Sequence, residues 1–499
     1  MSSPSSATQQ DLRNRKQNKQ IIVPPINTQQ VSSSSSANGS TSPEEDTAKQ
    51  QTECRTPKDE FIDALNKPHT ITILVASFAV LFYYSFIRHD AITTEQNVKR
   101  GIMAMIGLFL VYCAVQLRDG ILMRPHPVIW RLITGIGLVY LLFLVFLMFQ
   151  TKEDARQFMK YLDPSLGVPL PERDYANNCD IYTPNNPVSY FKNVYDTIYD
   201  EFILAHVLGY IAKALLFRDL KLCWCLSLFF EIMEITFQHW LPNFKECWWD
   251  HIIIDVLICN NIGIIIGLWI CDYLKMRKYP LWIGVTKMDT TPKKIKRIFQ
   301  QFTPFNWTSY DWHIFDDAKH FLYFCAIVLA MNIVDLNAFF LKYVLWVPPP
   351  NKLNVYRLLI WFCLGMPAIR EYYQYISDPN TKRIGANTWI AIGIIFTEIL
   401  VYFKFSEGYY LIPFPHHIWV NWVLFFMIII PWFIVFFFVT NREMRRRNPL
   451  LKFALNATLT LSMVPLIFMF LSGCPDLQYG REWFDNTIES LLQKYAYSN

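Results

Sequence analysis

The sequence predicts an all-α, polytopic membrane protein with ten or eleven transmembrane helices. Of its 499 residues, 53% are hydrophobic and 16% are aromatic. Many apolar runs have about 17–28 residues, and helices of that length cross the roughly 30 Å hydrocarbon core of a bilayer. Lys and Arg concentrate in the loops after alternate runs, as expected for cytoplasmic loops. A soluble multidomain protein would not carry such runs.

The apolar runs divide the chain into three parts. Residues 1–57 are rich in Ser, Gln, Thr and Pro, so we expect a disordered cytoplasmic N-terminal segment with no cleavable signal peptide. Residues 58–473 form the multi-span membrane domain, and residues 474–499 form a C-terminal tail. The candidate spans are 70–87, 101–117, 128–150, 198–217, 221–241, 248–274, 318–342, 355–374, 387–405, 416–440 and 450–472.

The basic loops predict the orientation. Loop 275–317 contains eight Lys and Arg residues, loop 441–449 contains four Arg residues, and both follow an even number of spans. Both loops, and with them the N-terminus, should therefore be cytoplasmic. Eleven spans would place the C-terminus in the lumen, together with residues 241–247. Cys179 and Cys247 fall on this same side, where a disulfide between them can form.

Ionisable residues interrupt one apolar stretch in the middle of the chain, and intramembrane charges are costly enough to mark functional sites. Glu231 and Glu234 are three residues apart and share one helix face. A Leu-Pro-Asn sequence breaks that helix, and Glu246 and Asp250 share a face of the next one. Two neighbouring helices therefore present four carboxylates towards a common space. The same stretch also contains His239, His251 and Asp255.

These carboxylates predict a bound divalent cation. Close carboxylates repel one another unless protons or a cation neutralise them, and hard oxygen ligands suit calcium or magnesium. Zinc is disfavoured because Cys247 has no CxxC partner. The expected ligands are Glu234, Glu246, Asp250 and the amide oxygen of Asn243. A single buried carboxylate is often a structural hydrogen-bond partner, but four within twenty residues favour a site.

Two further polar residues in apolar runs suit phosphate chemistry. His206 can serve as general base and then general acid near neutral pH, and we expect Glu231 to orient it. A lone histidine on an apolar helix is more often a packed core residue, so this interpretation depends on the neighbouring carboxylates. Arg370 could clamp a phosphate or carboxylate bidentately, or could equally pair with a glutamate to join two helices. The other intramembrane charges are Asp335, Glu371 and Glu398.

The sequence LPNFKECWWD, which is long and rare in composition, lies within the segment 213–264. This segment closely resembles the calcium-dependent, base-exchange type of phosphatidylserine synthase. Shorter matches extend the resemblance over roughly residues 60–410. They are found at 67–72, at Arg124-Pro125-His126-Pro127, and at 294–308, 335–342 and 367–373.

The resemblance implies an activity. Such enzymes lie in the endoplasmic reticulum membrane, need Ca²⁺ but no nucleotide, and replace the choline or ethanolamine headgroup of a preformed phospholipid with L-serine. The membrane domain would then be catalytic, with phosphatidylcholine or phosphatidylethanolamine and L-serine as its substrates. The residues on which activity should depend are His206, Glu231, Glu234, Asn243, Glu246, Asp250, Asp255 and Asn260. Arg124 would take part in feedback inhibition by the product.

The expected substrate-binding residues are Asp255, Asn260 and Arg370. On a helical wheel Asp255 lies roughly 180° from Glu246, so we expect it to bind the serine ammonium, or His251, rather than the metal. Animal members of the family have ten spans, and the run 450–472 would be an eleventh. The apolar, aromatic-rich faces of spans seven to ten would permit a homodimer.

Other functions fit the residues less well. A membrane cation or solute transporter would use the same carboxylates to carry ions, but the sequence has no second copy of the acidic cluster. A non-catalytic scaffold leaves that cluster unexplained. Enzymes that use a CDP-activated lipid carry Asp-Gly-x2-Ala-Arg, whereas Asp119-Gly120 is followed by Ile-Leu-Met-Arg, and the HxKxxxxD motif of phospholipase-D-like transferases is absent. The net charge of +5 is not clustered, so nucleic acid is not an expected partner.

Overall fold

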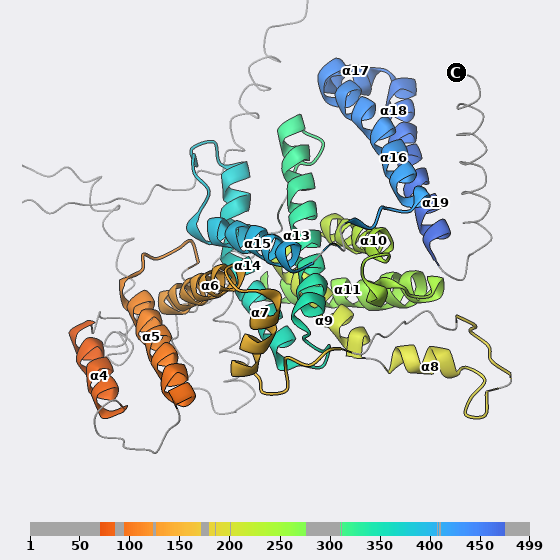
Figure 1. The fold of residues 1–499 in the computed structure, drawn as a ribbon. Coiled ribbons are helices and arrows are strands. Elements are labelled where there is room, and N and C mark those ends of the chain that lie inside the picture. Colours follow the sequence, from red (N-terminus) through yellow and green to blue (C-terminus); the bar gives the residue numbers. More distant parts are fainter. Residues whose placement is uncertain are drawn as a thin grey trace, which may run out of the picture. The chain divides into compact units, whose positions relative to one another are not determined.

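The structure is a computed structural model in which every described element is a helix (Figure 1). It describes residues 70–84, 94–122, 126–170, 179–184, 186–199, 201–275, 310, 312–406, 408 and 411–474. These residues all belong to one compact unit, which begins at Pro68. The predicted all-α class is confirmed for this part of the chain. The N-terminal segment 1–57, Arg124 and the tail after residue 474 lie outside it.

A helix, in some cases interrupted, occupies each apolar run. These are α4 (Thr70–Phe82), α5 (Thr94–Gln116), α6 (Pro127–Met148), α9 (Glu201–Phe217), α10 (Leu220–Phe237), η4 and α11 (Asp250–Asn260, Asn261–Lys275), α13 (Ala318–Leu345), α14 (Lys352–Ser377), α15 (Ala386–Phe405), α16 and η6 (His416–Ile434, Val435–Val439), and α18 and α19 (Pro449–Ser462, Val464–Gly473). Shorter helices lie between them: α7 (Lys152–Phe158), η2 (Met159–Tyr161), α8 (Lys192–Ile198), η3 (Pro242–Phe244) and α17 (Arg442–Arg447).

Seven helical stretches among the described residues are long and apolar enough to cross a membrane. They begin at Gln96, Pro127, Asp250, Ala318, Ala386, His416 and Pro449. Two shorter apolar helices span Thr72–Phe82 and Phe202–Phe217. α10 is also long, but it carries Lys221, Glu231 and Glu234. The chain is therefore a multi-pass membrane protein, and the total of ten or eleven spans stays a prediction.

A two-residue turn sets α9 and α10 against each other. Arg218 has a positive φ of 53°, a conformation that ends a helix. The Asp219 carboxylate accepts a hydrogen bond from the Leu222 N–H at 2.7 Å, an N-cap that typically contributes about 1 kcal/mol. His206 precedes this turn by about as many residues as Glu231 follows it. The two side chains therefore lie at a similar depth in the helix pair.

Small residues allow α11 to approach α9 closely. A Cβ atom added to Gly263 would lie 2.6 Å from the Val207 carbonyl oxygen, and one added to Gly267 would lie 2.6 Å from the Ala214 Cβ. Glycines four residues apart permit such close packing of membrane helices. Because η4 continues directly into α11, this contact also brings η4 against the helix that carries His206.

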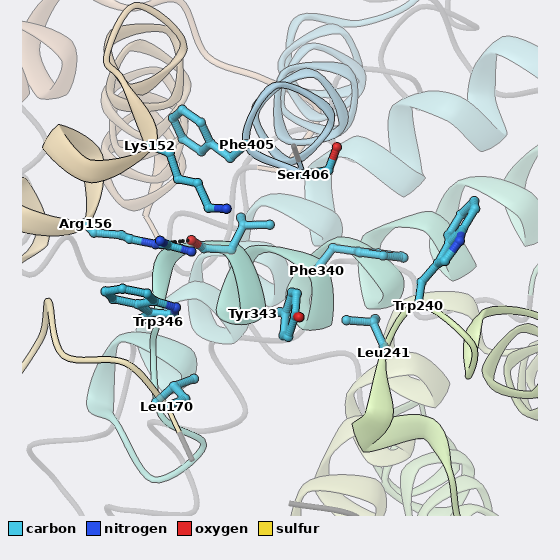
Figure 2. A pocket seen from close by; sticks show the side chains of 11 residues that line it. Lys152, Arg156, Leu170, Trp240, Leu241, Phe340, Tyr343, Trp346, Phe405 and Ser406 are labelled. Carbon is cyan, nitrogen blue, oxygen red and sulfur yellow. Dashed lines mark hydrogen bonds between the residues drawn. The ribbon is translucent and has the colours of Figure 1, made fainter. Parts of the chain in front are cut away.

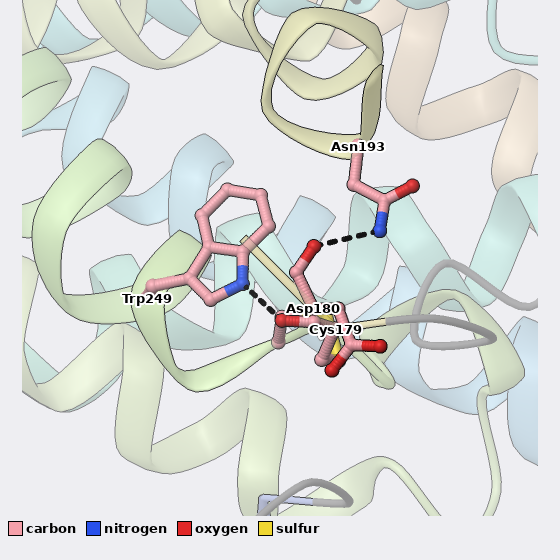
Figure 3. Close-up of a disulfide and its surroundings, with 5 residues drawn as sticks. Cys179, Asp180, Asn193 and Trp249 are labelled. Atoms are coloured by element: carbon pink, nitrogen blue, oxygen red, sulfur yellow. Dashed lines mark hydrogen bonds between the residues drawn. A yellow bond between two sulfur atoms is a disulfide. The ribbon is translucent and has the colours of Figure 1, made fainter. Parts of the chain in front are cut away.

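A disulfide joins Cys179 to Cys247, as the sequence allowed (Figure 3). The Trp249 indole N–H donates to the Cys179 carbonyl oxygen at 3.0 Å, and the Asn193 amide donates to the Asp180 carbonyl oxygen at 2.8 Å. The bridge closes a loop of 68 residues, for which the chain-entropy model gives about 4 kcal/mol of stabilisation. It therefore ties the segment before α8 to the loop that leads into η4.

One buried carboxylate holds four helices together away from the acidic cluster. Glu398 of α15 accepts hydrogen bonds from the Arg357 guanidinium of α14 at 2.7 and 2.9 Å. It also accepts from the Tyr140 hydroxyl of α6 at 2.6 Å and from the Asn337 amide of α13 at 3.0 Å. Because this network satisfies the buried charge, Glu398 has a structural role.

Candidate active site

Three helices and one loop bring nine polar side chains together. They are His206 of α9, Ser227, Glu231 and Glu234 of α10, Glu246 of the loop after η3, and Asp250, His251, Asp255 and Asn260 of η4. Several are charged or ionisable and almost fully buried, which is unusual without a compensating partner or ligand.

His251 lies at the point where three carboxylates converge. Its Nδ1 atom is 2.8 Å from a carboxylate oxygen of Glu231, 3.4 Å from one of Glu234 and 3.7 Å from one of Glu246. Its ring is fully buried. One oxygen of Glu231, one of Glu234 and the Nε2 atom of His251 are buried without a hydrogen bond to any described residue. This cluster is therefore incomplete as a hydrogen-bonded network.

His206 lies in a second, linked group. Its Nδ1 atom is 3.1 Å from Oδ1 of Asn260, and the Asn260 amide nitrogen donates to the Ser227 hydroxyl at 2.9 Å. Because that amide turns its oxygen towards the imidazole, Nδ1 of His206 must carry the hydrogen, which leaves the Nε2 lone pair as the proton acceptor. A carboxylate oxygen of Asp255 lies 3.7 Å from the same Nδ1 atom, close enough to stabilise an imidazolium.

The expected pairing of Glu231 with His206 is wrong, because Glu231 contacts His251 and Asn260 contacts His206. The reason is the helix type of η4, which is a π-helix over all its 11 residues. Residues five apart are about 140° apart around an α-helix but roughly 50° apart around a π-helix. Asp250, Asp255 and Asn260 therefore turn towards one side.

The helical-wheel argument that separated Asp255 from Glu246 assumed one continuous helix, which these two residues do not share. Glu246 precedes η4 in a non-helical loop, and a carboxylate oxygen of Asp255 lies 3.7 Å from Nδ1 of His206. The expectation that Asp255 is not a metal ligand stays a prediction. Along η4 itself, Asp250, Asp255 and Asn260 share one side of the π-helix. The five-residue spacing Asp-x4-Asp-x4-Asn was the signal that could have predicted this arrangement.

Two predicted site residues lie apart from the cluster. Asn243 is half-buried in η3, and within the described part of the chain it makes no hydrogen bond to the carboxylates. The Arg370 guanidinium of α14 lies 5.8 Å from the centre of the Tyr310 ring. It does not pair with its neighbour Glu371, whose carboxylate accepts hydrogen bonds from the Asn387 side chain at 2.7 Å and from the Thr388 N–H at 3.0 Å.

The carboxylates fit a hard divalent cation. Glu231, Glu234 and His251 each offer one ligand atom, and these three atoms lie within 4.8 Å of one another. The buried carboxylate oxygens that lack hydrogen bonds supply acceptors of the kind that Ca²⁺ prefers. Glu246, with a side chain that is 21% exposed, adds a further carboxylate at the edge of the group.

A cavity of about 150 Å³ lies beside the loop that leads to Asn243 (Figure 2). Trp240 and Leu241 of that loop form part of the cavity wall, and Lys152 and Arg156 bring two cations to it. The other lining residues are Leu170, Phe340, Tyr343, Val344, Trp346, Phe405 and Ser406. The acidic cluster contributes no side chain to this lining, so the cavity is separate from it.

A family model described as "Phosphatidyl serine synthase" matches residues 125–406, more than half of the chain. The chain belongs to the phosphatidyl serine synthase family. The matched range runs from the start of α6 to the end of α15 and contains the whole acidic cluster. The helices α16 to α19 lie beyond it.

Curated relatives support the same family. The chain is 43% identical over 372 residues to CDP-diacylglycerol–serine O-phosphatidyltransferase 2 of Oryza sativa subsp. japonica, which covers 73% of this chain and 87% of the relative. It is 40% identical over 404 residues to phosphatidylserine synthase 2 of Danio rerio, covering 80% and 89%. Identity to phosphatidylserine synthase 2 of Homo sapiens is 39% over 383 residues, covering 77% and 78%.

Proposed function

We propose that the protein makes phosphatidylserine by Ca²⁺-dependent headgroup exchange, replacing the choline or ethanolamine of a preformed phospholipid with L-serine. The observation that carries this proposal is the placement of two complementary groups side by side. An imidazole with its Nε2 lone pair available lies next to a carboxylate cluster of the kind that binds a hard cation. The membership of the family supports the product.

His206 performs the proton transfers of the exchange. Its Nε2 atom takes the proton of the serine hydroxyl while the serine oxygen forms a bond to phosphorus. The bond from phosphorus to the choline or ethanolamine oxygen breaks, and the imidazolium returns the proton to the departing alkoxide. Asn260, held by Ser227, keeps the Nδ1 hydrogen in place, and Asp255 stabilises the imidazolium at 3.7 Å. Because the leaving and entering groups are both alcohols, one residue serves both transfers.

The carboxylates Glu231, Glu234, Glu246 and Asp250 would hold the cation. When bound there, Ca²⁺ neutralises the negative charge of the phosphodiester. This assignment keeps Glu234, Glu246 and Asp250 from the predicted ligand set and adds Glu231, because one of its buried oxygens lacks a hydrogen bond to any described residue. Asn243 stays a proposed ligand that would have to approach the carboxylates from η3.

The remaining assignments are also proposals. Arg370 would bind a phosphate or carboxylate, and Arg124 would take part in feedback inhibition by phosphatidylserine. The endoplasmic reticulum membrane is the proposed location, with the N-terminus in the cytoplasm, as the distribution of basic loops predicts. A homodimer through the aromatic-rich spans stays a proposal.

A second donor must be considered because the printed name of the rice relative includes CDP-diacylglycerol. With that donor, CMP rather than an alcohol would leave the phosphorus. The sequence carries no Asp-Gly-x2-Ala-Arg motif, which favours a preformed phospholipid. A cation or solute transporter is a weaker alternative, because it gives no role to the polarised His206.

The choice of donor is tested with purified protein and labelled L-serine. Liposomes contain phosphatidylcholine, phosphatidylethanolamine or CDP-diacylglycerol in an inert lipid, with Ca²⁺ present and no other nucleotide. We expect labelled phosphatidylserine from the first or second donor. Product from CDP-diacylglycerol alone would replace exchange by the nucleotide-dependent reaction, and no product from any donor would favour ion flux as the next assay.

A further inference from the structure

A buried lysine lies on the same helix as His206 and has no role in the mechanism above. Lys213 of α9 is only 9% exposed, and its ammonium lies 2.8 Å from a carboxylate oxygen of Asp335 in α13. The ammonium also lies 4.1 Å from the centre of the Tyr210 ring. A buried ammonium is costly unless it is paired, so this position is constrained.

The Tyr210 hydroxyl beside this ammonium is incompletely satisfied. Tyr210 is 3% exposed, and its hydroxyl makes no hydrogen bond of good geometry to any described residue. A buried polar group in this state destabilises a fold by about 1–3 kcal/mol. Such groups occur where a ligand supplies the missing partner. A hydroxyl donor next to an ammonium is suited to an oxyanion.

One face of α9 extends from the proposed base, His206, to the Lys213 ammonium. His206, Tyr210 and Lys213 are four and three residues apart, so they stack along one side of the helix. The Lys213 ammonium lies 5.7 Å from the ring of Phe230, which directly precedes Glu231 on α10. On this face Tyr210 lies between His206, which borders the acidic cluster, and Lys213.

Both substrates of the exchange bring an oxyanion to a site that is rich in carboxylates. The phospholipid carries its phosphodiester and L-serine carries its carboxylate, and each is repelled by the cluster unless a positive charge faces it. Lys213 carries three N–H donors, and Asp335 accepts from it at only one short contact.

We propose that Lys213 and Tyr210 bind a substrate oxyanion, with Asp335 holding the ammonium in position. This inference rests on the proposed function, whose substrates supply the anion. The simpler structural interpretation is that the Lys213–Asp335 pair only ties α9 to α13. If the pair were only a tether, replacing both residues by apolar ones would leave exchange activity intact. If the ammonium binds an anion, the same double replacement would still lower exchange.

The test compares two acceptors in phosphatidylcholine liposomes: L-serine, and ethanolamine, which has no carboxylate. For Lys213→Met we expect kcat/KM with L-serine to fall about 10- to 100-fold, the usual effect of losing a charged hydrogen-bond donor. If ethanolamine exchange is retained, the bound oxyanion is the serine carboxylate. If kcat/KM falls equally with both acceptors and the dependence of the rate on lipid concentration shifts, the bound oxyanion is the phosphodiester.

Two further variants separate binding from tethering. Asp335→Asn keeps the ammonium but removes the charge that positions it, so we expect a smaller loss of kcat/KM than in Lys213→Met. The double variant Lys213→Met/Asp335→Leu removes the buried charges together, and we expect it to be folded but as defective as Lys213→Met. Recovery of wild-type exchange in this double variant would overturn the inference and leave a structural tether.

Tyr210→Phe provides a readout that a structural role would not produce. Removing an unsatisfied buried hydroxyl should raise the melting temperature, whereas losing a substrate contact should lower kcat/KM a few-fold. Wild-type activity in both Tyr210→Phe and Lys213→Met would overturn the inference while leaving the proposed function intact. An inactive wild-type protein with both acceptors would instead overturn the proposed function, and the inference with it.

Discussion

Asn260 holds His206 in one tautomer: its amide oxygen lies 3.1 Å from the imidazole Nδ1 atom while its amide nitrogen donates to Ser227 at 2.9 Å. The two histidines of the site consequently differ in their surroundings. His206 faces an amide and one carboxylate, whereas His251 faces three carboxylates. This difference in surroundings suits His206 to proton transfer and places His251 within the proposed cation-binding cluster.

Replacement of His206 or of its amide partner should lower exchange to different extents. His206→Ala removes the base, so we expect a loss of about 10²–10⁴-fold in kcat. Asn260→Leu keeps the imidazole but not its orientation, and we expect a smaller loss, about 10- to 100-fold. Steady-state exchange of labelled L-serine measures both. Asn332→Leu is a matched control, since the amide of this buried asparagine donates to the Val328 carbonyl oxygen of its own helix and, among the described residues, to no other helix.

Loss of one carboxylate from the cluster should weaken the response to Ca²⁺. In Glu234→Gln the group retains its size but loses a charge, so we expect the Ca²⁺ concentration for half-maximal activity to rise about tenfold or more. Glu371→Gln removes a buried carboxylate outside the cluster and should leave that concentration unchanged. Equal Ca²⁺ responses in the two variants would remove Glu234 from the cation site.

The disulfide should support the loop that carries Glu246. Cys247 directly follows Glu246, so Cys247→Ser should lower thermal stability, by up to about 4 kcal/mol in the chain-entropy model, and should also raise the Ca²⁺ requirement. The melting temperature and a Ca²⁺ titration of activity measure the two effects. Cys325→Ser replaces an exposed free cysteine and should change neither. A variant that is less stable but has a normal Ca²⁺ response would show that Glu246 is positioned without the bridge.

The hydrogen-bond network around Glu398 should affect the stability of the fold and not the exchange reaction. Glu398→Ala leaves the Arg357 guanidinium buried without its partner, which typically destabilises a protein by about 3–5 kcal/mol. Arg357→Met/Glu398→Leu removes both charges and should be closer to wild type. Thermal unfolding in detergent ranks the wild type, Glu398→Ala and the double variant by stability. If the double variant were the least stable, Glu398 would not owe its effect to an unpaired arginine.

The sequence allowed the acidic cluster to be predicted, but not the pairing of its members. Glu231 and Glu234 follow ordinary α-helical spacing, and the Leu-Pro-Asn break placed a second helix beside them. The partners of the two histidines depend on the π-helix from Asp250 to Asn260, and an apolar pattern read with a period of 3.6 does not reveal one. For this reason the approach of Asp255 to His206 was not predicted.

Contacts between distant residues were outside the reach of sequence patterns. Lys213 and Asp335 pair across two helices separated by more than 100 residues, and nothing local to either position marks the other. Arg357 and Glu398 were likewise found as partners only in the folded chain. Arg370 was a candidate partner for a glutamate, but the adjacent Glu371 is satisfied by Asn387 and Thr388.

The most direct test of the central claim is a double-label exchange assay in phosphatidylcholine liposomes. Choline release and L-serine incorporation are measured together, with Ca²⁺ or with a chelator, for the wild type and for His206→Ala. We predict one choline released for each phosphatidylserine formed, only with Ca²⁺ and only in the wild type. Phosphatidylserine formed without choline release, or full exchange in His206→Ala, would contradict the account.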